Sequence, residues 1–225
     1  MNQINENLRI SLCNSYDNGF VGDEYRIKIL DLIKEFDTLS KIWKSNIADL
    51  MGVPYWYEAI DPLLEIADGL IKEEKWEIDY EYLDRGVRFT LFAIASSLIK
   101  ISFPPDRLQE YSDRIYKNIV EASRNSAYAV KFIQALAAQG DKKSHEVLKE
   151  YLKKGVNVYD ATFDAVIYYK DPSDLPLIEK YTSGIHVPRG HLAGSNADLL
   201  RLAKRAYKKL QKEIEKQNKL RSSLA

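Results

Sequence analysis

Two histidines and an arginine lie close together in a segment rich in glycine and proline. The segment runs from Gly184 to His191, and its polar residues are His186, Arg189 and His191. Imidazoles bind metal ions and transfer protons near neutral pH, and such loops often carry functional residues. A closed zinc site needs about four ligands, however, and neither a partnered cysteine nor a helical H-E-x-x-H pattern completes one. We therefore predict a loop that packs on the protein or contacts a partner, without metal, cofactor or catalytic residues; a hydrolase using His186 and His191 is the enzymatic alternative.

A second candidate is a pair of carboxylates, Asp160 and Asp164, which lie four residues apart and so share one helical face. Paired carboxylates can divide acid and base roles or hold a cation. Like charges on a solvated helix face are the commoner explanation. Tyr168 continues the same face, and Lys131 and Gln134 of a preceding helix are expected beside it. We predict that these five side chains form one polar wall of a groove that binds a partner.

The last helix of the sequence is strongly basic. From Arg201 to Arg221 it carries nine basic residues against Glu213 and Glu215. Spacings of three and four residues place many of the cations on one face, where they can neutralise phosphates. The phosphate-binding candidates are Arg201, Lys204, Arg205 and Lys208. The alternative is a solvated polar cap at the end of a helical stack, and the net negative remainder of the chain would repel nucleic acid.

An acidic segment with several aromatic residues lies between residues 55 and 84. Its aromatic candidates for partner contact are Tyr55, Trp56, Tyr57 and Trp76. Aromatic side chains among carboxylates suit a basic protein partner, because tyrosine and tryptophan are frequent anchors of interfaces. The alternative is that these rings belong to the core and that the acids around them are only solvated.

Apolar residues recur at helical spacing along most of the chain, and no convincing strand interrupts them. Helix signals are clear in the second half, where Asp141 and Asp171 are N-caps and Gly140 and Gly155 end helices. We predict an all-α protein of about nine or ten helices. Four regions are expected: a polar N-terminal arm (1–22), an N-terminal helical region (23–124), helical repeats (125–211) and a charged C-terminal tail that frays (212–225).

One pattern occurs twice with a spacing of thirty residues. The segment from Asp141 to Tyr151 aligns with the segment from Asp171 to Tyr181: the Asp, an apolar pair, Glu and Lys charges and the Tyr recur in register. A fixed period of this size is typical of stacked helical units, none of which can bury its apolar face alone.

These helix pairs and the proline that follows Asp171 resemble the HEAT/armadillo class of α-helical repeats, most clearly over residues 125–210. The resemblance implies an α-α superhelix of antiparallel helix pairs that acts as a binding scaffold, although the period is shorter than the usual ~40–47 residues. One enzymatic branch, the alkylpurine DNA glycosylases of HEAT-like fold, has a catalytic Asp flanked by tryptophans, which no stretch here matches. By analogy of fold, a small acidic binder also resembles immunity proteins that neutralise bacterial toxins.

The composition is that of an ordinary globular protein: 225 residues, 45% apolar and 29% charged. No apolar run has the length of a membrane span, no signal peptide is evident, and a single Cys13 excludes an internal disulfide. We therefore expect a cytoplasmic protein. The sequence predicts a non-enzymatic scaffold that binds a protein, of the immunity or a regulatory type. The alternative is a nucleic-acid-binding or DNA-repair protein that uses the basic helix.

Overall fold

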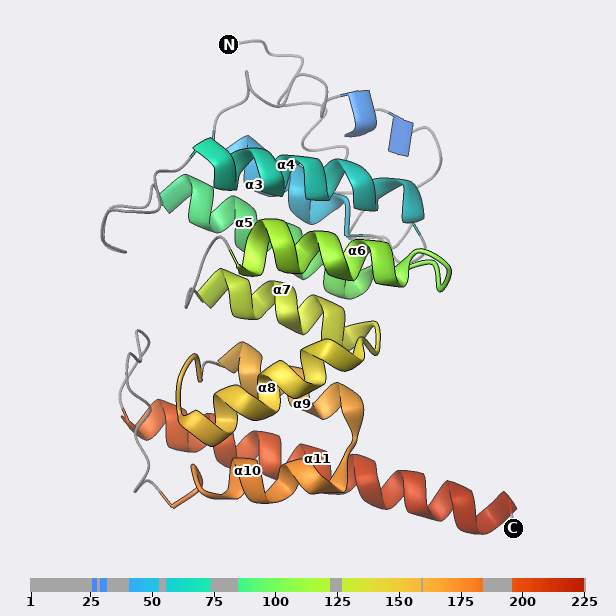
Figure 1. The fold of residues 1–225 in the computed structure, drawn as a ribbon, viewed down its shortest axis with the longest axis vertical. Helices are drawn as coiled ribbons and strands as arrows, with labels where there is room; N and C mark the ends of the chain where they lie inside the picture. Colours follow the sequence, from blue (N-terminus) through green and yellow to red (C-terminus); the bar gives the residue numbers. More distant parts are fainter. Residues whose placement is uncertain are drawn as a thin grey trace. The chain divides into compact units, whose positions relative to one another are not determined.

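The computed structural model is all-α over the residues that it describes, as predicted (Figure 1). These residues are 26–27, 29–31, 41–52, 56–73, 85–121, 127–158, 160–183 and 196–224, and no strand occurs within them. The chain divides between Pro104 and Pro105 into two compact units, residues 1–104 and 105–225.

Besides the helical residues 26–27 and 29–31, the described part of the first unit contains three helices and one 3-10 turn. They are α3 (Lys41–Leu50), η2 (Tyr57–Ala59), α4 (Ile60–Glu73) and α5 (Arg85–Lys100). Helix α5 packs against α3 and also contacts α4. An apolar stripe of α4 is buried at three- and four-residue spacing: Ile60, Leu63, Leu64, Ala67 and Ile71.

Helices α3 and α5 approach closely at Gly52. The Oγ atom of Ser97 donates a hydrogen bond to the carbonyl oxygen of Ala48 at 2.5 Å. A Cβ atom at Gly52 would lie 2.7 Å from that Oγ and 2.9 Å from the Cα of Ser97. Because one of these neighbours is backbone, a larger residue at position 52 requires the two helices to separate.

Gly52→Ala is therefore expected to lower the free energy of unfolding by about 1–3 kcal/mol, the usual cost of overpacking. Denaturant unfolding followed by circular dichroism measures this loss. Gly69→Ala in α4 is the matched control, because a Cβ there has no neighbour within 4 Å. Inside a helix this substitution should raise stability by about 0.5–1 kcal/mol. Equal unfolding midpoints for the two variants would contradict the close helix contact.

The described part of the second unit contains five α-helices of eight or more residues and three short or irregular elements. In order they are α6 (Leu108–Ile115), the π-helical turn η4 (Tyr116–Val120), α7 (Ala127–Ala138), α8 (Lys142–Lys154), α9 (Asp160–Tyr169), the 3-10 turn η5 (Pro172–Asp174), α10 (Leu175–Glu179) and α11 (Asn196–Leu224). Helix α9 contacts both α7 and α11, whereas α8 contacts α7, α9 and α10. These contacts place α9 between α7 and α11.

The start of α8 is fixed by Asp141, as the sequence predicts. Its carboxylate accepts hydrogen bonds from the backbone N–H and the hydroxyl of Ser144, both at 2.7 Å. Ser112 of α6 donates to the same carboxylate at 2.9 Å, and the Tyr116 hydroxyl donates to Ser144 at 3.0 Å. The Tyr169 hydroxyl donates to the Asp141 carbonyl at 2.7 Å. This helix cap therefore also ties α6 and α9 to α8.

The other predicted helix ends in this region are also confirmed. Gly155 ends α8 with a left-handed backbone (φ 68°), and its N–H donates to the carbonyl of Tyr151 at 2.9 Å. Asp171 accepts from the N–H of Ser173 at 2.9 Å, and Pro172 occupies the first position of η5.

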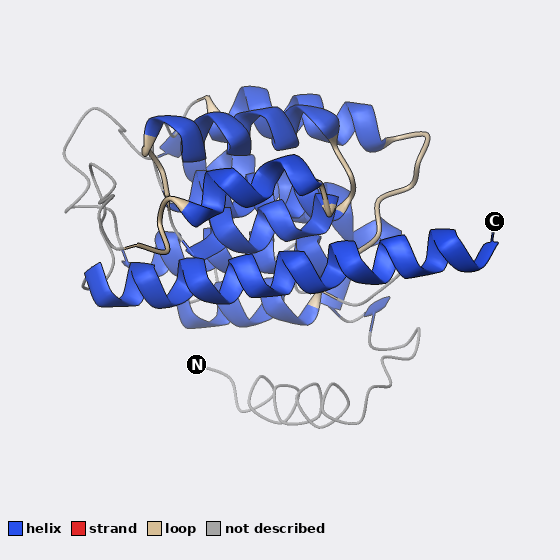
Figure 2. Ribbon diagram, turned by 90° about the horizontal axis from the view of Figure 1, so that it is seen from below, coloured by secondary structure: helices blue, strands red, loops and turns tan. Residues whose placement is uncertain are grey.

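Helix α11 is longer than expected. We predicted fraying from Lys212, but the helix continues to Leu224, and its last turns extend past the neighbouring helices of the unit (Figures 1 and 2). Its buried residues recur at three- and four-residue spacing: Leu199, Ala203, Ala206, Leu210 and Ile214. Ile214 (8% exposed) thus continues the apolar stripe beyond Lys212, which explains why the helix does not end there. Across the described ranges, no helix combines the length and apolar character needed to cross a membrane.

Candidate functional site

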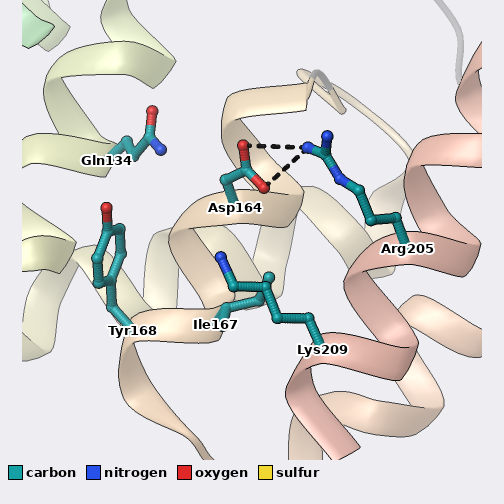
Figure 3. Close-up of a pocket in the computed structure, with 6 residues that line it drawn as sticks. All are labelled: Gln134, Asp164, Ile167, Tyr168, Arg205 and Lys209. Carbon is teal, nitrogen blue, oxygen red and sulfur yellow. Dashed lines mark hydrogen bonds and ion pairs between the residues drawn. The ribbon is translucent and has the colours of Figure 1, made fainter. Parts of the chain in front are cut away.

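Side chains of three helices line a cavity of about 350 Å³ in the second unit (Figure 3). The lining residues come from α7, α9 and α11: Gln134, Asp164, Ile167, Tyr168, Arg205 and Lys209. Residues four apart lie on one face of a helix, so α9 presents Asp164 and Tyr168 together and α11 presents Arg205 and Lys209 together. Because α9 contacts both α7 and α11, these polar faces meet.

An ion pair links two walls of the cavity. One terminal nitrogen of Arg205 lies 3.2 Å from Oδ1 and 3.5 Å from Oδ2 of Asp164 (Figure 3). The two side chains are 62% and 35% exposed, so the pair contributes little to stability. A guanidinium has five N–H groups, and most of those of Arg205 remain open. Asp164 therefore holds Arg205 beside the cavity while leaving it able to bind.

Gln134 occupies the side of Asp164 opposite Arg205 (Figure 3). The residue is only 4% exposed, and its Oε1 atom is buried without a hydrogen-bond partner. The amide nitrogen is therefore the polar atom that Gln134 offers to the cavity.

Tyr168 and Lys209 complete the polar lining. Burial and the nearby Asp164 carboxylate raise the pKa of Tyr168, so its hydroxyl remains a donor at neutral pH. Lys209 is exposed and makes no ion pair with a described residue. The formal charge of the lining is therefore +1, from Arg205, Lys209 and Asp164. Such a lining can bind a group that accepts hydrogen bonds, but it presents no nucleophile beside a base.

The cavity joins two sets of residues that the sequence analysis treated separately. Three come from the predicted groove and one from the phosphate-binding alternative: Gln134, Asp164, Tyr168 and Arg205. Lys131 is half-buried on α7 and does not line the cavity. Asp160 is exposed at the start of α9, where its Oδ1 accepts from the N–H of Ala161 at 2.7 Å. The two carboxylates of α9 therefore do not converge on one cavity as an acid–base pair.

The basic face of α11 carries acidic residues among its cations. Arg201 pairs with Asp198 at 3.4 Å, and Lys216 pairs with Glu213 at 2.8 Å. Three of the four phosphate-binding candidates are exposed but lie outside the cavity: Arg201, Lys204 and Lys208. Carboxylates therefore lie at both ends of the run of cations on α11, Asp198 before it and Glu213 after it.

The aromatic candidates of the first unit separate by burial. Trp56 is 1% exposed and belongs to the core, so its predicted role as an exposed anchor is corrected. Tyr57 is 41% exposed. The remaining predicted contact residues lie outside the described residues: Tyr55, Trp76, His186, Arg189 and His191.

A second polar cluster, which the sequence analysis did not identify, links α8 to the start of α10. Nε2 of His145 lies 2.7 Å from Oδ2 of Asp174, whose side chain is fully buried. Lys149 Nζ lies 3.1 Å from Asp171 Oδ2 and 3.9 Å from Asp174 Oδ1. The His145 ring also stacks on Tyr169 with centroids 4.0 Å apart. His145 and Lys149 are four residues apart and lie on one face of α8, whereas Asp171 and Asp174 lie at the start and the end of the turn that leads into α10.

This cluster contains three side chains of kinds that bind metals, one imidazole and two carboxylates. His145, Asp171 and Asp174 place one ligand atom each within 4.8 Å of one another. The Lys149 ammonium, however, already supplies a cation to both carboxylates. A structural link between helices explains the cluster more simply. Ser112 and Tyr116 bind Asp141 and Ser144 at the start of α8, just as His145 and Lys149 bind the two carboxylates at the turn that leads into α10.

Buried tyrosines make the second unit sensitive to alkaline pH. Burial raises the pKa of Tyr181 to about 12. Burial and the nearby Asp141 carboxylate also raise the pKa values of Tyr116 and Tyr169. The hydroxyl of Tyr181 donates to the Leu152 carbonyl at 2.7 Å. A tyrosine whose pKa is higher in the folded state stabilises the fold. This stabilisation is complete below the unfolded pKa of 10.0 and is lost as the pH rises through the folded pKa.

The free energy of unfolding is therefore expected to fall from pH 10 to about 12. Each such tyrosine contributes a slope of up to about 1.4 kcal/mol per pH unit. Urea unfolding at successive pH values measures the slope, and tyrosinate absorbance follows the titration. Tyr181→Phe should reduce the slope in this window, whatever its effect on stability at pH 7. An unchanged slope in that variant would contradict the assignment to Tyr181.

No protein-family model, curated protein or solved structure matches this chain.

Proposed function

We propose that the chain is a non-enzymatic scaffold that binds a protein partner through the surface around the cavity of α7, α9 and α11. One observation carries the proposal. Gln134, Asp164 and Tyr168 share a cavity with Arg205 and Lys209, and this combination of a buried amide, a partly exposed tyrosine and both charge signs is typical of protein-recognition surfaces.

We also propose a HEAT-like superhelix in which α8 pairs with α9 and α10 with α11. Two observations support it. Asp141 caps α8, and the aligned Asp171 caps the 3-10 turn η5 that leads directly into α10. The second helices α7, α9 and α11 contact one another in series and together line the cavity. In such repeats the second helices build the binding face.

The charge pattern of α11 favours a protein over a nucleic acid. Binding to a phosphate backbone depends on cations that are free to replace counterions. Arg201 and Arg205 are each next to a carboxylate, Asp198 and Asp164 respectively. These carboxylates would meet a run of phosphates at the same surface, whereas a protein partner can supply both charge signs.

The test is affinity capture from the native host lysate, with and without nuclease, using the full chain. We expect a stoichiometric protein that survives nuclease and is lost when Lys209→Glu is used as bait. Lys204→Glu is the matched control, since Lys204 is an exposed lysine of the same helix outside the cavity. It should retain the partner.

Nucleic acid as the recovered partner would overturn the proposal in favour of the alternative. In that case Lys204→Glu and Lys209→Glu should weaken binding about equally, and binding should fall steeply with salt. A protein partner that both variants retain would place the binding surface elsewhere and would also overturn the proposal.

A further inference from the structure

The cavity is lined by hydrogen-bond donors that the protein itself does not use. No described residue accepts a hydrogen bond from the Gln134 amide nitrogen, the Tyr168 hydroxyl or the Lys209 ammonium. Arg205 uses one terminal nitrogen on Asp164 and keeps its other nitrogens open. Four donor groups thus face one space together with the Asp164 carboxylate, which already accepts from Arg205, so the lining favours a group that accepts hydrogen bonds.

The charge of the lining restricts that acceptor further. The net charge of the lining is +1, from Arg205, Lys209 and Asp164. A ligand with one negative charge neutralises this lining, whereas a ligand with two leaves an excess negative charge. Asp164 also disfavours a second negative group close to itself. The two oxygens of a carboxylate can accept from an open N–H group of Arg205 and from the Lys209 ammonium at the same time.

We infer that the cavity binds the side-chain carboxylate of a Glu or Asp residue on the protein partner; this inference rests on the proposed function. The charges around the cavity favour an acidic side chain within a chain over a single terminal carboxylate. Exposed cations follow α11 at three- and four-residue spacing: Arg201, Arg205, Lys209 and Lys212. At about 1.5 Å per residue the row spans roughly 16 Å, which suits an acidic partner surface with more than one carboxylate.

A phosphodiester is also a monoanion, but it brings further phosphates with it. Because a nucleic acid carries a phosphate at every nucleotide, these would also approach Asp160, Asp164 and Asp198 of α9 and α11. A protein partner can instead place its acidic side chains only opposite the cations. The cavity volume of about 350 Å³ is near the lower limit of ligand pockets and suits a single side chain with its adjoining backbone.

The experiment is an NMR titration of the isotope-labelled full chain with N-acetyl-glutamate-N′-methylamide. We expect saturable shifts of the Gln134 carboxamide and the Arg205 side-chain N–H signals at millimolar concentrations. N-acetyl-glutamine-N′-methylamide has the same shape without the charge and should bind about tenfold more weakly. Dimethyl phosphate and N-acetyl-alanine serve as phosphodiester and terminal-carboxylate probes, and both should bind more weakly than the glutamate probe.

Two variants locate the binding. Lys209→Ala should reduce affinity for the glutamate probe several-fold, whereas Lys204→Ala should leave it unchanged; both residues are exposed, so the fold is retained. Equal affinity for the glutamate and glutamine probes would overturn the inference. So would tighter binding of dimethyl phosphate or N-acetyl-alanine, or shifts that do not change in Lys209→Ala.

The outcome separates this inference from the proposed function. If the glutamate probe does not bind but a captured protein is still lost with Lys209→Glu, the scaffold proposal stands and the carboxylate inference fails. If the probe binds at Lys209 but capture yields only nucleic acid, the proposed function fails, and the carboxylate belongs to a ligand other than a protein.

Discussion

Replacing His145 with alanine is expected to lower the free energy of unfolding at pH 7 by about 3–5 kcal/mol. The substitution removes the hydrogen-bond partner of Asp174, whose side chain is fully buried, and a ring stacked on Tyr169. Burial raises the pKa of Asp174, and the hydrogen bond from His145 opposes that rise. The variant therefore leaves a buried carboxyl that is costly to ionise. Urea unfolding followed by circular dichroism measures the loss.

The pH dependence of this loss identifies its cause. A carboxyl group whose pKa is raised in the folded state stabilises the fold at pH values below its unfolded pKa, which is 3.8 for Asp174. This stabilisation is lost as the pH rises through the folded pKa. The pKa of Asp174 should rise further without His145. The difference between His145→Ala and the unchanged chain should therefore shrink as the pH falls from 7 toward about 4. A difference that stays constant over this range would contradict a role for the Asp174 charge.

Lys154→Ala is the matched control on the same helix. Lys154 pairs with Glu150 four residues earlier, but both side chains are more than half exposed. Removing an exposed pair of this kind should change stability by less than about 1 kcal/mol. A loss in Lys154→Ala as large as that in His145→Ala would show that α8 is sensitive to any lost ion pair.

Asp141→Ala is expected to lower the free energy of unfolding by about 2–4 kcal/mol. Loss of the cap itself costs about 0.5–2 kcal/mol. In addition, Ser112 and Ser144 are fully buried and both donate to the Asp141 carboxylate. A buried hydroxyl that loses its acceptor adds about 1–3 kcal/mol. Chemical denaturation at pH 7 measures the total.

Two further variants separate the parts of this effect. Asp141→Asn keeps an N-cap oxygen but offers fewer acceptors, so its loss should be intermediate. Asp198→Ala is the control near an exposed helix start, where Asp198 pairs with Arg201 and both side chains are at least half exposed; it should change stability by less than about 1 kcal/mol. A loss in Asp141→Ala no larger than this would show that Ser112 and Ser144 find other acceptors.

Local signals account for what the sequence predicted correctly. Asp141, Gly155 and Asp171 set helix ends because their side chain or backbone geometry acts on residues within about one turn. The buried stripes of α4 and α11 follow from helical spacing alone. The early stop predicted for α11 was wrong because Ile214 is buried although its neighbours in the sequence are charged, and packing decided that burial.

Only some residues of the candidate site could be predicted from the sequence. Asp164 and Tyr168 could be placed on one face, because four-residue spacing fixes that relation within a helix. Their meeting with Arg205, which is 41 positions away, depends on the contact between α9 and α11. Likewise, Trp56 could not be assigned to core or surface from its type, and its burial was decided by packing.

The sequence by itself determined the helical class, the caps and the helix faces, because these depend on residues close together in the chain. The tertiary structure alone decided that Arg205 and Lys209 line a cavity with Gln134, and that His145 meets Asp174. It decided them because contacts between helices depend on how whole faces pack, and a spacing of three or four residues within one helix carries no information about the neighbour it will face.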